Sequence, residues 1–224
     1  MTKAISRDLS VSVGDYLKAL WLSSQDGSVS TGDLAIHLAV SPPSVTGMFN
    51  KLKKLGLVTY ERYYGAQLTP QGQQEALRLI RRHRLVETFL IDYLNYSWEE
   101  VHQEAELMEH AMTDRFTERL AKRLGQPLFD PHGDPIPRAD GTVPAQPSIP
   151  LAEVPVGKRL EVTRVRSQDV NVLQYIISLG VKPGTEVEVT AREPYGGLLQ
   201  IVLGGLQQAV SRELALLIEG QVIS

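Results

Sequence analysis

The sequence predicts a mainly α-helical protein with a β-rich C-terminal part, and three observations lead to that prediction. Up to about residue 124, apolar residues recur at spacings of three and four, which is typical of amphipathic helices. A Pro-rich stretch between Pro127 and Pro155 interrupts this pattern. Short alternating segments then indicate a small barrel. We expect domains over residues 1–75, 76–140 and 151–224, with a Pro-rich linker over 141–150.

The composition is that of a folded soluble protein, with 42% hydrophobic and 22% charged residues among 224. The chain has no cysteine, so any metal site must use oxygen and nitrogen ligands. Its formal net charge is −3, so nucleic-acid binding would require a local basic patch. Because neither a run of about 18–20 apolar residues nor a signal-peptide core is found, we expect a cytoplasmic protein without a membrane partner.

A helix-turn-helix unit is predicted after a first helix over residues 8–23. Either Ser30 or Thr31 can cap a short helix over 33–38. The second helix of the unit begins well, because Ser41 suits the N-cap and Pro42 suits the first helical position. Gly56 suits the left-handed residue that ends a helix. The expected buried face of this second helix consists of Val45, Phe49, Leu52 and Leu55.

Residues 57–69 alternate around Tyr64-Gly65-Ala66 and predict a hairpin, which would be the wing of a winged helix. Hydroxyl residues at the start of the recognition helix would face bases or phosphates, and basic residues would supply charge. Residues 1–75 hold seven Lys or Arg against six Asp or Glu, so only the patch is basic. A chance pattern or a mere dimer scaffold is the alternative reading. The residues expected to contact DNA are Thr31, Ser41, Pro43, Ser44, Thr46, Lys51, Lys53, Lys54 and Arg62.

Helices are expected over 71–94 and 98–124, and the second has an unusual charge pattern. From Tyr96 to Asp114 inclusive, the chain has six carboxylates and no Lys or Arg. A solvated helix face usually carries both signs, because each opposite pair stabilises by about 0.2–0.5 kcal/mol. The alternative to a plain solvated face is therefore a bound cation. Both helices have more apolar residues in their stripes than a metal site needs, so a homodimer interface is also expected.

Candidate ligands lie on both helices. His102, Glu106 and Glu109 form a stripe about 100° from the apolar one, and His110 follows Glu106 by one turn. On the preceding helix, His83 fills a gap in the apolar face and Glu87 follows it by four residues. A lone histidine in such a place is more often a hydrogen-bonded core residue. Together, these oxygen and nitrogen donors indicate a divalent-metal site.

The C-terminal part is expected to be a barrel of about five strands with one short helix over 169–179. Few basic residues cluster there, so nucleic acid is not its expected partner. The expected strands cover 157–165, 181–189, 198–203, 207–210 and 215–218.

As a whole, the chain resembles the metal-dependent transcriptional repressors typified by the diphtheria toxin repressor and the manganese transport regulators. The residues that carry the resemblance are Arg82-His83-Arg84-Leu85 with Glu87, Val101-His102 with Glu104, Glu109-His110, and Gly133-Asp-Pro-Ile-Pro137. The resemblance implies a winged helix, a helical metal-binding and dimerisation domain, and an SH3-like barrel akin to ferrous-iron-transport accessory domains.

The resemblance also implies two metal sites. The primary, activating site would use Asp15, Glu106, Glu109 and His110. The ancillary site would use His83, Glu87, His102 and, from the barrel, Asp169. Because Val172 cannot ligate, Gln168 or Asn171 is the alternative barrel ligand.

Two departures from the family pattern concern the metal. Iron-responsive members have Met and Cys where this chain has Asp15 and Glu106, so the resemblance implies Mn²⁺, with Fe²⁺ as the alternative. Barrel-less manganese regulators have Glu at the position of Lys18, so their second manganese site cannot be transferred intact.

The implied function is a metal-activated, homodimeric repressor that binds an inverted-repeat operator in double-stranded DNA and controls metal uptake and homeostasis genes. One alternative is a winged-helix regulator that senses an organic ligand. A metallohydrolase is a further alternative, but it needs an open coordination position, a general base and a substrate cleft. No nucleophile motif or phosphate-binding glycine loop is found, so we expect no enzyme.

Overall fold

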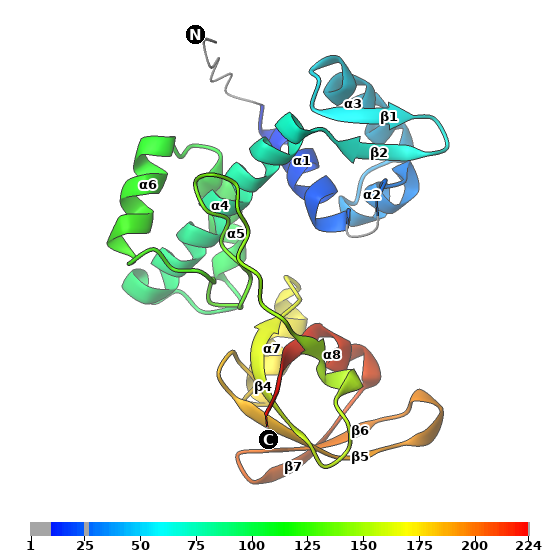
Figure 1. Ribbon diagram of the computed structural model, residues 1–224, viewed down its shortest axis with the longest axis vertical. Helices are drawn as coiled ribbons and strands as arrows, with labels where there is room; N and C mark the ends of the chain where they lie inside the picture. Colours follow the sequence, from blue (N-terminus) through cyan, green and yellow to red (C-terminus); the bar gives the residue numbers. More distant parts are fainter. Residues whose placement is uncertain (1–9, 25–26, 224) are drawn as a thin grey trace. The chain divides into compact units, whose positions relative to one another are not determined.

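The computed structural model describes residues 10–24 and 27–223. The chain divides into two compact units (Figure 1). The N-terminal unit contains the chain up to Arg82 together with residues 109–112 and 137–142. The C-terminal unit contains residues 83–108, 113–136 and the chain from Val143 onwards. Among the described residues, no helix is both long and apolar enough to cross a membrane.

The N-terminal unit contains the predicted helix-turn-helix, made of α1 (Val11–Ser23), α2 (Thr31–His37) and α3 (Pro42–Lys54) (Figure 1). The Ser30 side chain accepts a hydrogen bond from Asp33 N, so Ser30 and not Thr31 caps α2. Ser41 caps α3 by accepting from Ser44 N, and Pro42 opens the helix. Gly56 has a φ of 75°, which is the left-handed conformation expected after the helix.

The wing is an antiparallel hairpin of β1 (Val58–Glu61) and β2 (Gly65–Leu68). Its turn lies at residues 62–64, earlier than expected, and Tyr63 adopts a φ of 74° there. Val45, Phe49 and Leu52 of α3 are fully buried, as predicted, whereas Leu55 is 36% exposed. The prediction for Leu55 is wrong because α3 ends at Lys54 and Leu55 is its capping residue.

The next helices are α4 (Pro70–Leu94), α5 (Val101–Glu109) and α6 (Asp114–Arg123). The prediction of one helix over 98–124 is wrong, because Thr113 begins a new helix. Its side chain accepts a hydrogen bond from Phe116 N and so satisfies an N–H group that a continuous helix would bond to its own backbone. Of the apolar stripe predicted at Val101, Ala105, Met108 and Met112, three members are buried, but the prediction for Met108 is wrong, because this residue is 37% exposed.

The Pro-rich stretch has few regular elements, but its first part is not a simple linker. Asp130, His132 and Ile136 are all buried. The Asp130 carboxylate accepts hydrogen bonds from the backbone N–H groups of His132 and Asp134, both at 2.9 Å. Arg84 of α4 donates to the Pro135 carbonyl. Residues 130–134 therefore form a buried turn held by side chains, which we call the 130–134 turn.

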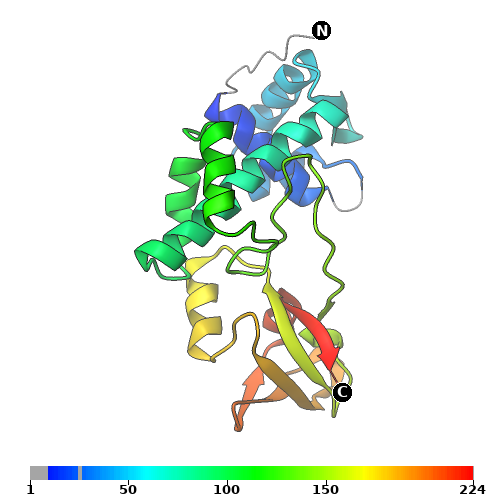
Figure 2. The ribbon, with the colours of Figure 1, turned by 60° about the vertical axis from the view of Figure 1, so that its left-hand side comes forward.

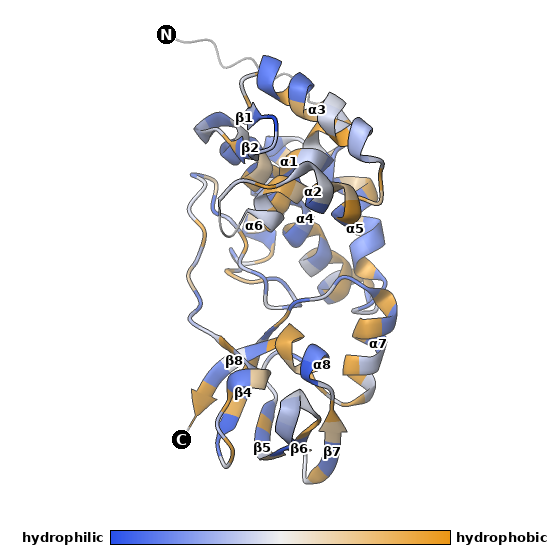
Figure 3. Cartoon of the chain, turned by 90° about the vertical axis from the view of Figure 1, so that its right-hand side faces the viewer, coloured by the Kyte–Doolittle hydropathy of each residue, from blue (hydrophilic) through white to orange (hydrophobic). Residues whose placement is uncertain are grey.

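The barrel is a six-stranded antiparallel sheet in the order β3-β8-β4-β5-β6-β7, with β8 beside β4 in Figure 2. The hydropathy of the strand residues alternates, as Figure 3 shows for β4 and β5, and the apolar members form the core. The strands are β3 (Ile149–Pro150), β4 (Arg159–Val165), β5 (Glu186–Arg192), β6 (Leu199–Leu203), β7 (Leu206–Val210) and β8 (Ile218–Ile223). The short helices are η1 (Leu151–Glu153), α7 (Val170–Ser178), η2 (Pro194–Gly196) and α8 (Arg212–Leu217).

The expected closing strand over 215–218 is wrong. Ser211 accepts a hydrogen bond from Leu214 N and thereby starts α8, which covers most of that range. The strand that closes the sheet is β8, and it pairs with both β3 and β4.

Candidate metal centre and nucleic-acid interface

Asp15, Glu109 and His110 converge in the N-terminal unit, although 95 residues separate Asp15 from His110. His110 Nε2 lies 2.8 Å from Asp15 Oδ1 and 3.5 Å from Glu109 Oε1. Glu109 is completely buried, whereas Asp15 and His110 are partly exposed. Ligands at about 2.1 Å from an octahedral ion lie roughly 3 Å apart. The spacing of these donors therefore fits one divalent ion, which we call the first cluster.

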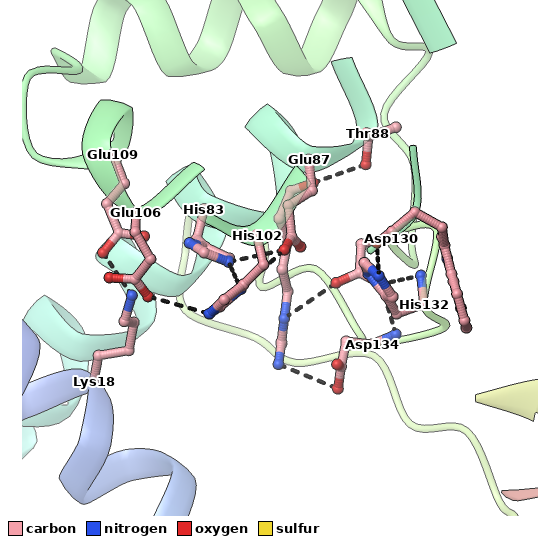
Figure 4. Close-up of polar contacts among 12 residues, drawn as sticks. Lys18, His83, Glu87, Thr88, His102, Glu106, Glu109, Asp130, His132 and Asp134 are labelled. Atoms are coloured by element: carbon pink, nitrogen blue, oxygen red, sulfur yellow. Dashed lines mark hydrogen bonds and ion pairs between the residues drawn. The ribbon is translucent and has the colours of Figure 1, made fainter. Parts of the chain in front are cut away.

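Lys18 lies beside the first cluster. Its Nζ is 2.7 Å from Glu109 Oε1, and the Lys18 side chain is only 11% exposed (Figure 4). The helical periodicity of α1 places Lys18 away from the apolar stripe, but the structure buries it against this carboxylate. An ion bound by Glu109 must therefore share that carboxylate with the Lys18 ammonium.

Gly14 allows the His110 ring to approach α1. A Cβ atom at position 14 would lie 3.0 Å from His110 Cε1 and 3.0 Å from Leu79 Cδ2. Such separations are shorter than ordinary van der Waals contacts. The position of the His110 ring thus depends on a glycine one residue before Asp15.

The second cluster lies in the C-terminal unit and consists of His83, Glu87 and His102. His83 Nε2 is 2.9 Å from His102 Nδ1 and 3.0 Å from Glu87 Oε1, and His102 Nδ1 is 3.2 Å from the same oxygen (Figure 4). Three edges close to 3 Å correspond to one face of an octahedral coordination shell. Burial alone would raise the pKa of Glu87, but the charge of His83 and hydrogen bonds from both histidines hold that pKa well below its usual range.

Glu106 and Asp169 lie in places that the resemblance does not imply. Glu106 converges with His83 and His102, and its Oε1 is 3.6 Å from His102 Nε2. Of the four donors expected for the primary site, three, namely Asp15, Glu109 and His110, therefore lie in the first cluster. Asp169 caps α7, because its Oδ1 accepts from Asn171 N at 2.8 Å and Val172 N at 3.1 Å. Gln168 lines a small cavity beside the second cluster.

Sequence reasoning missed Asp130 and His132. Potential ligand atoms of these two residues and of Glu87 all lie within 4.8 Å of one another, and all three residues are buried. Burial, together with the negative charges of Glu87 and Asp134, raises the pKa of Asp130 well above its usual range. The available signal was an acid and an imidazole two residues apart in Asp130-Pro-His132, but prolines and glycine on either side made the stretch look like a linker.

The candidate nucleic-acid interface consists of the start of α3 and the wing. Ser41, Pro43 and Ser44 are exposed, and the two serine hydroxyls are 2.8 Å apart. Lys53 Nζ donates to the Tyr60 carbonyl at 2.8 Å, so this lysine holds the wing against α3. Lys51 and Lys54 are exposed. The other expected contact residues Thr31, Thr46 and Arg62 line an open pocket of about 590 Å³ together with Ser30, Asn50, Tyr60, Tyr63 and Gly65.

Tyr63 at the wing tip was not among the predicted contact residues. It is 90% exposed, and the Arg62 guanidinium lies 5.2 Å from the centre of its ring. An arginine stacked on an exposed tyrosine at the tip of a hairpin is suited to contact a phosphate backbone or a groove.

Models of three protein families match consecutive parts of the chain. The iron-dependent repressor N-terminal DNA-binding domain matches residues 8–66, and the iron-dependent repressor metal-binding and dimerisation domain matches residues 69–138. The FeoA domain matches residues 149–222. Together these matches follow the order of domains that the sequence predicts.

Individual relatives agree with these models. The chain is 36% identical over 108 residues to an uncharacterised helix-turn-helix-type transcriptional regulator of Methanocaldococcus jannaschii, covering 47% of this chain and 86% of that relative. It is 28% identical over 213 residues to the iron-dependent repressor IdeR of Mycobacterium leprae, covering 89% and 92%.

Solved structures are similar over nearly the whole chain. A manganese-dependent transcriptional repressor in complex with manganese has 37% sequence identity and a TM-score of 0.86, covering 95% of this chain and 99% of that one. The manganese regulator SloR has 35% identity and a TM-score of 0.78, covering 93% and 97%.

Proposed function

This chain belongs to the family of metal-dependent transcriptional repressors typified by the diphtheria toxin repressor, and we propose that Mn²⁺ bound at the first cluster is the signal that switches its DNA binding on. The first cluster carries the proposal. Asp15 belongs to α1, which packs against α2 and α3, whereas Glu109 is the last residue of α5 and His110 follows it. An ion that joins them fixes α1, and through it the recognition helix, relative to residues 109–110.

The choice of Mn²⁺ follows from the donors. Asp15 and Glu109 offer hard carboxylate oxygens and His110 offers an imidazole, and none of the three offers sulfur. Such donors suit Mn²⁺ and Fe²⁺ better than softer ions. A carboxylate can bind through one or two oxygens, which allows the higher coordination numbers that Mn²⁺ accepts. Glu106 remains a proposed fourth ligand of the primary site, and Fe²⁺ is the alternative ion.

The second cluster is proposed to hold an ancillary ion. His83, Glu87 and His102 join α4 to α5, so an ion there would stiffen the helical part of the C-terminal unit. It would support the response to metal without being the switch. Asp169 stays a proposed ligand from the barrel, and because its Oδ1 accepts the N–H groups of Asn171 and Val172, the ion would bind through Oδ2.

Dimerisation is proposed through the helical part of the C-terminal unit. Leu107 is 77% exposed and Phe116 is 49% exposed, although both are large apolar side chains. Exposed apolar groups of this size on neighbouring helices are typical of an interface. A two-fold dimer would place two recognition helices on an inverted-repeat operator. We further propose that the protein acts in the cytoplasm and catalyses no reaction.

Selection of DNA tests the proposal without knowledge of the operator. The full-length protein is used to enrich random duplexes in the presence of Mn²⁺, and the enriched sequences are then bound with Mn²⁺, with Fe²⁺ under anaerobic conditions, and with chelator. We expect an inverted repeat that is bound with Mn²⁺ and released by chelator. Equal binding in chelator would instead favour a regulator that responds to an organic ligand.

A further inference from the structure

The two edges of the barrel sheet are built differently. β3 at one edge is two residues long and ends in Pro150, which has no N–H group to offer to another strand. β7 at the other edge is five residues long, contains no proline or charged residue, and pairs with β6 without a bulge (Figure 1). Among the described residues, no strand pairs with its outer side. Sheets usually protect such an edge with lysine, proline or a bulge, so β7 is an open edge.

The turn before β7 determines which backbone groups point outward. Gly204 and Gly205 connect β6 to β7 with φ angles of 56° and 82°. Positive φ at both positions is typical of a type I′ turn, whose flanking residues, here Leu203 and Leu206, form a hydrogen-bonded pair. Hydrogen-bonded and non-hydrogen-bonded pairs alternate along an antiparallel ladder. The N–H and C=O groups of residues 207 and 209 therefore point away from β6, towards the open edge.

The side chains of β7 suit an uncharged partner. Leu206 is 68% exposed although it is a large apolar residue, and Gln207 and Ala209 are also exposed. Gln208 lies on the same face of the strand as Leu206, and its Nε2 donates to the Leu179 carbonyl at 3.3 Å. A glutamine amide has two N–H groups and an accepting oxygen, so it is complementary to a second amide of the same kind.

We propose that β7 is an interface between two copies of this chain, in which the two β7 strands pair antiparallel about a two-fold axis at Gln208. In this register Gln207 lies opposite Ala209 of the second copy, and both residues direct their N–H and C=O groups towards the other strand. Leu206 lies opposite Val210 of the second copy, so its exposed side chain is covered. This register pairs every residue of β7, whereas a shift by one residue would oppose outward-pointing groups to inward-pointing ones.

Charge and area both support a second copy as the partner. Because β7 has no charged residue, two copies of the strand meet without the repulsion that opposed like charges cause. The two short edges bury on the order of a few hundred Å², less than the roughly 1,000 Å² of a stable interface. The contact is therefore weak by itself and forms where copies are concentrated, as on DNA that carries neighbouring operators. That role rests on the proposed function, whereas the pairing of the strands does not.

Cysteine crosslinking of the full-length protein tests the register, because the chain has no cysteine of its own. In Gln208→Cys the new thiols of the two copies would face each other in a non-hydrogen-bonded pair, with Cβ atoms about 4.5–5.5 Å apart. A small movement brings them to the roughly 3.5–4.5 Å of a disulfide. Gln207→Cys is the matched control, because its thiols would lie diagonally, about 7–8 Å apart. Gln207 is the more exposed of the two, so random collisions would favour the control.

Under mild oxidation at high protein concentration, without DNA or metal, Gln208→Cys should form a covalent dimer at least about 10-fold faster than Gln207→Cys. Equal rates, or a faster rate in the control, would overturn the inference and leave the edge to an extended segment of another protein. Adding Ala209→Pro to Gln208→Cys removes an outward N–H and no bond to β6, so the rate should fall to that of the control. An unchanged rate would also overturn the inference. The melting temperature of each reduced variant reports folding.

Discussion

Replacing Gly14 by alanine tests how closely the first cluster depends on the position of the His110 ring. The added Cβ would lie 3.0 Å from His110 Cε1, whereas ordinary carbon contacts are about 3.5–4.0 Å. The ring must therefore move by roughly half an ångström, or Leu79 and α1 must move instead. Metal–ligand bonds tolerate deviations of about 0.2 Å. We expect a loss of Mn²⁺ affinity of about 10- to 100-fold, similar to the loss seen when the partner that orients a ligand is removed.

The effect of Gly14→Ala on folding should be small, because the helix preference of alanine offsets the cost of the two close contacts with His110 and Leu79. Alanine stabilises a helix interior by about 0.5–1 kcal/mol relative to glycine. The metal-free variant should therefore melt at a temperature close to that of the parent protein, while its Mn²⁺ affinity falls. Gly47→Ala in α3 is the matched control, because nothing lies within 4 Å of a Cβ at that position. Calorimetric titration with Mn²⁺ at fixed pH measures both variants. Unchanged affinity in Gly14→Ala would show that His110 does not bind the ion in the position described.

Three further changes test other parts of the account. Lys18→Met removes the ammonium beside the fully buried Glu109. In denaturant unfolding, the free energy of unfolding of the metal-free variant should fall by about 3 kcal/mol, and Mn²⁺ should stabilise the variant more than it stabilises the parent. Equal stabilisation would mean that Lys18 and the ion do not share Glu109. Lys51→Ala should reduce the slope of log affinity against log salt by about 0.9 on every DNA sequence, and an unchanged slope would place Lys51 away from phosphate. Leu107→Glu should raise the dimer dissociation constant at least about 10-fold in analytical ultracentrifugation, whereas an undisturbed dimer would move the interface elsewhere on the protein.

Local chemistry explains why the helix-turn-helix could be predicted from the sequence. Ser41, Pro42 and Gly56 each act within three or four residues of their own position, and the structure places all three as their types require. The same local rule explains one of the errors. Thr113 is also a good N-cap, but apolar residues continue at helical spacing on both sides of it. The sequence therefore predicted one continuous helix where α5 ends and α6 begins.

The metal clusters depend on contacts that no local pattern contains. His110 meets Asp15 across 95 residues, and the sequence suggested this pairing only through resemblance to a family. Lys18 has the helical position of a surface residue, yet its buried partner Glu109 lies 91 residues away. Asp130 and His132 were overlooked for a different reason. Prolines usually mark exposed connections, but here backbone N–H groups are satisfied by the Asp130 side chain, so the turn can be buried.

One measurement decides whether the first cluster is the switch. A single inverted-repeat duplex is bound by the parent protein, by Asp15→Ala and by His83→Ala over a titration of free Mn²⁺. If the first cluster is the switch, fluorescence anisotropy should show parent affinity rising at least about 100-fold with Mn²⁺, which corresponds to a coupling free energy of about 2.7 kcal/mol. Asp15→Ala should lose this rise, and His83→Ala should keep most of it. Equal DNA affinity of the parent protein in Mn²⁺ and in chelator would contradict the account, and a greater loss in His83→Ala than in Asp15→Ala would exchange the roles of the two clusters.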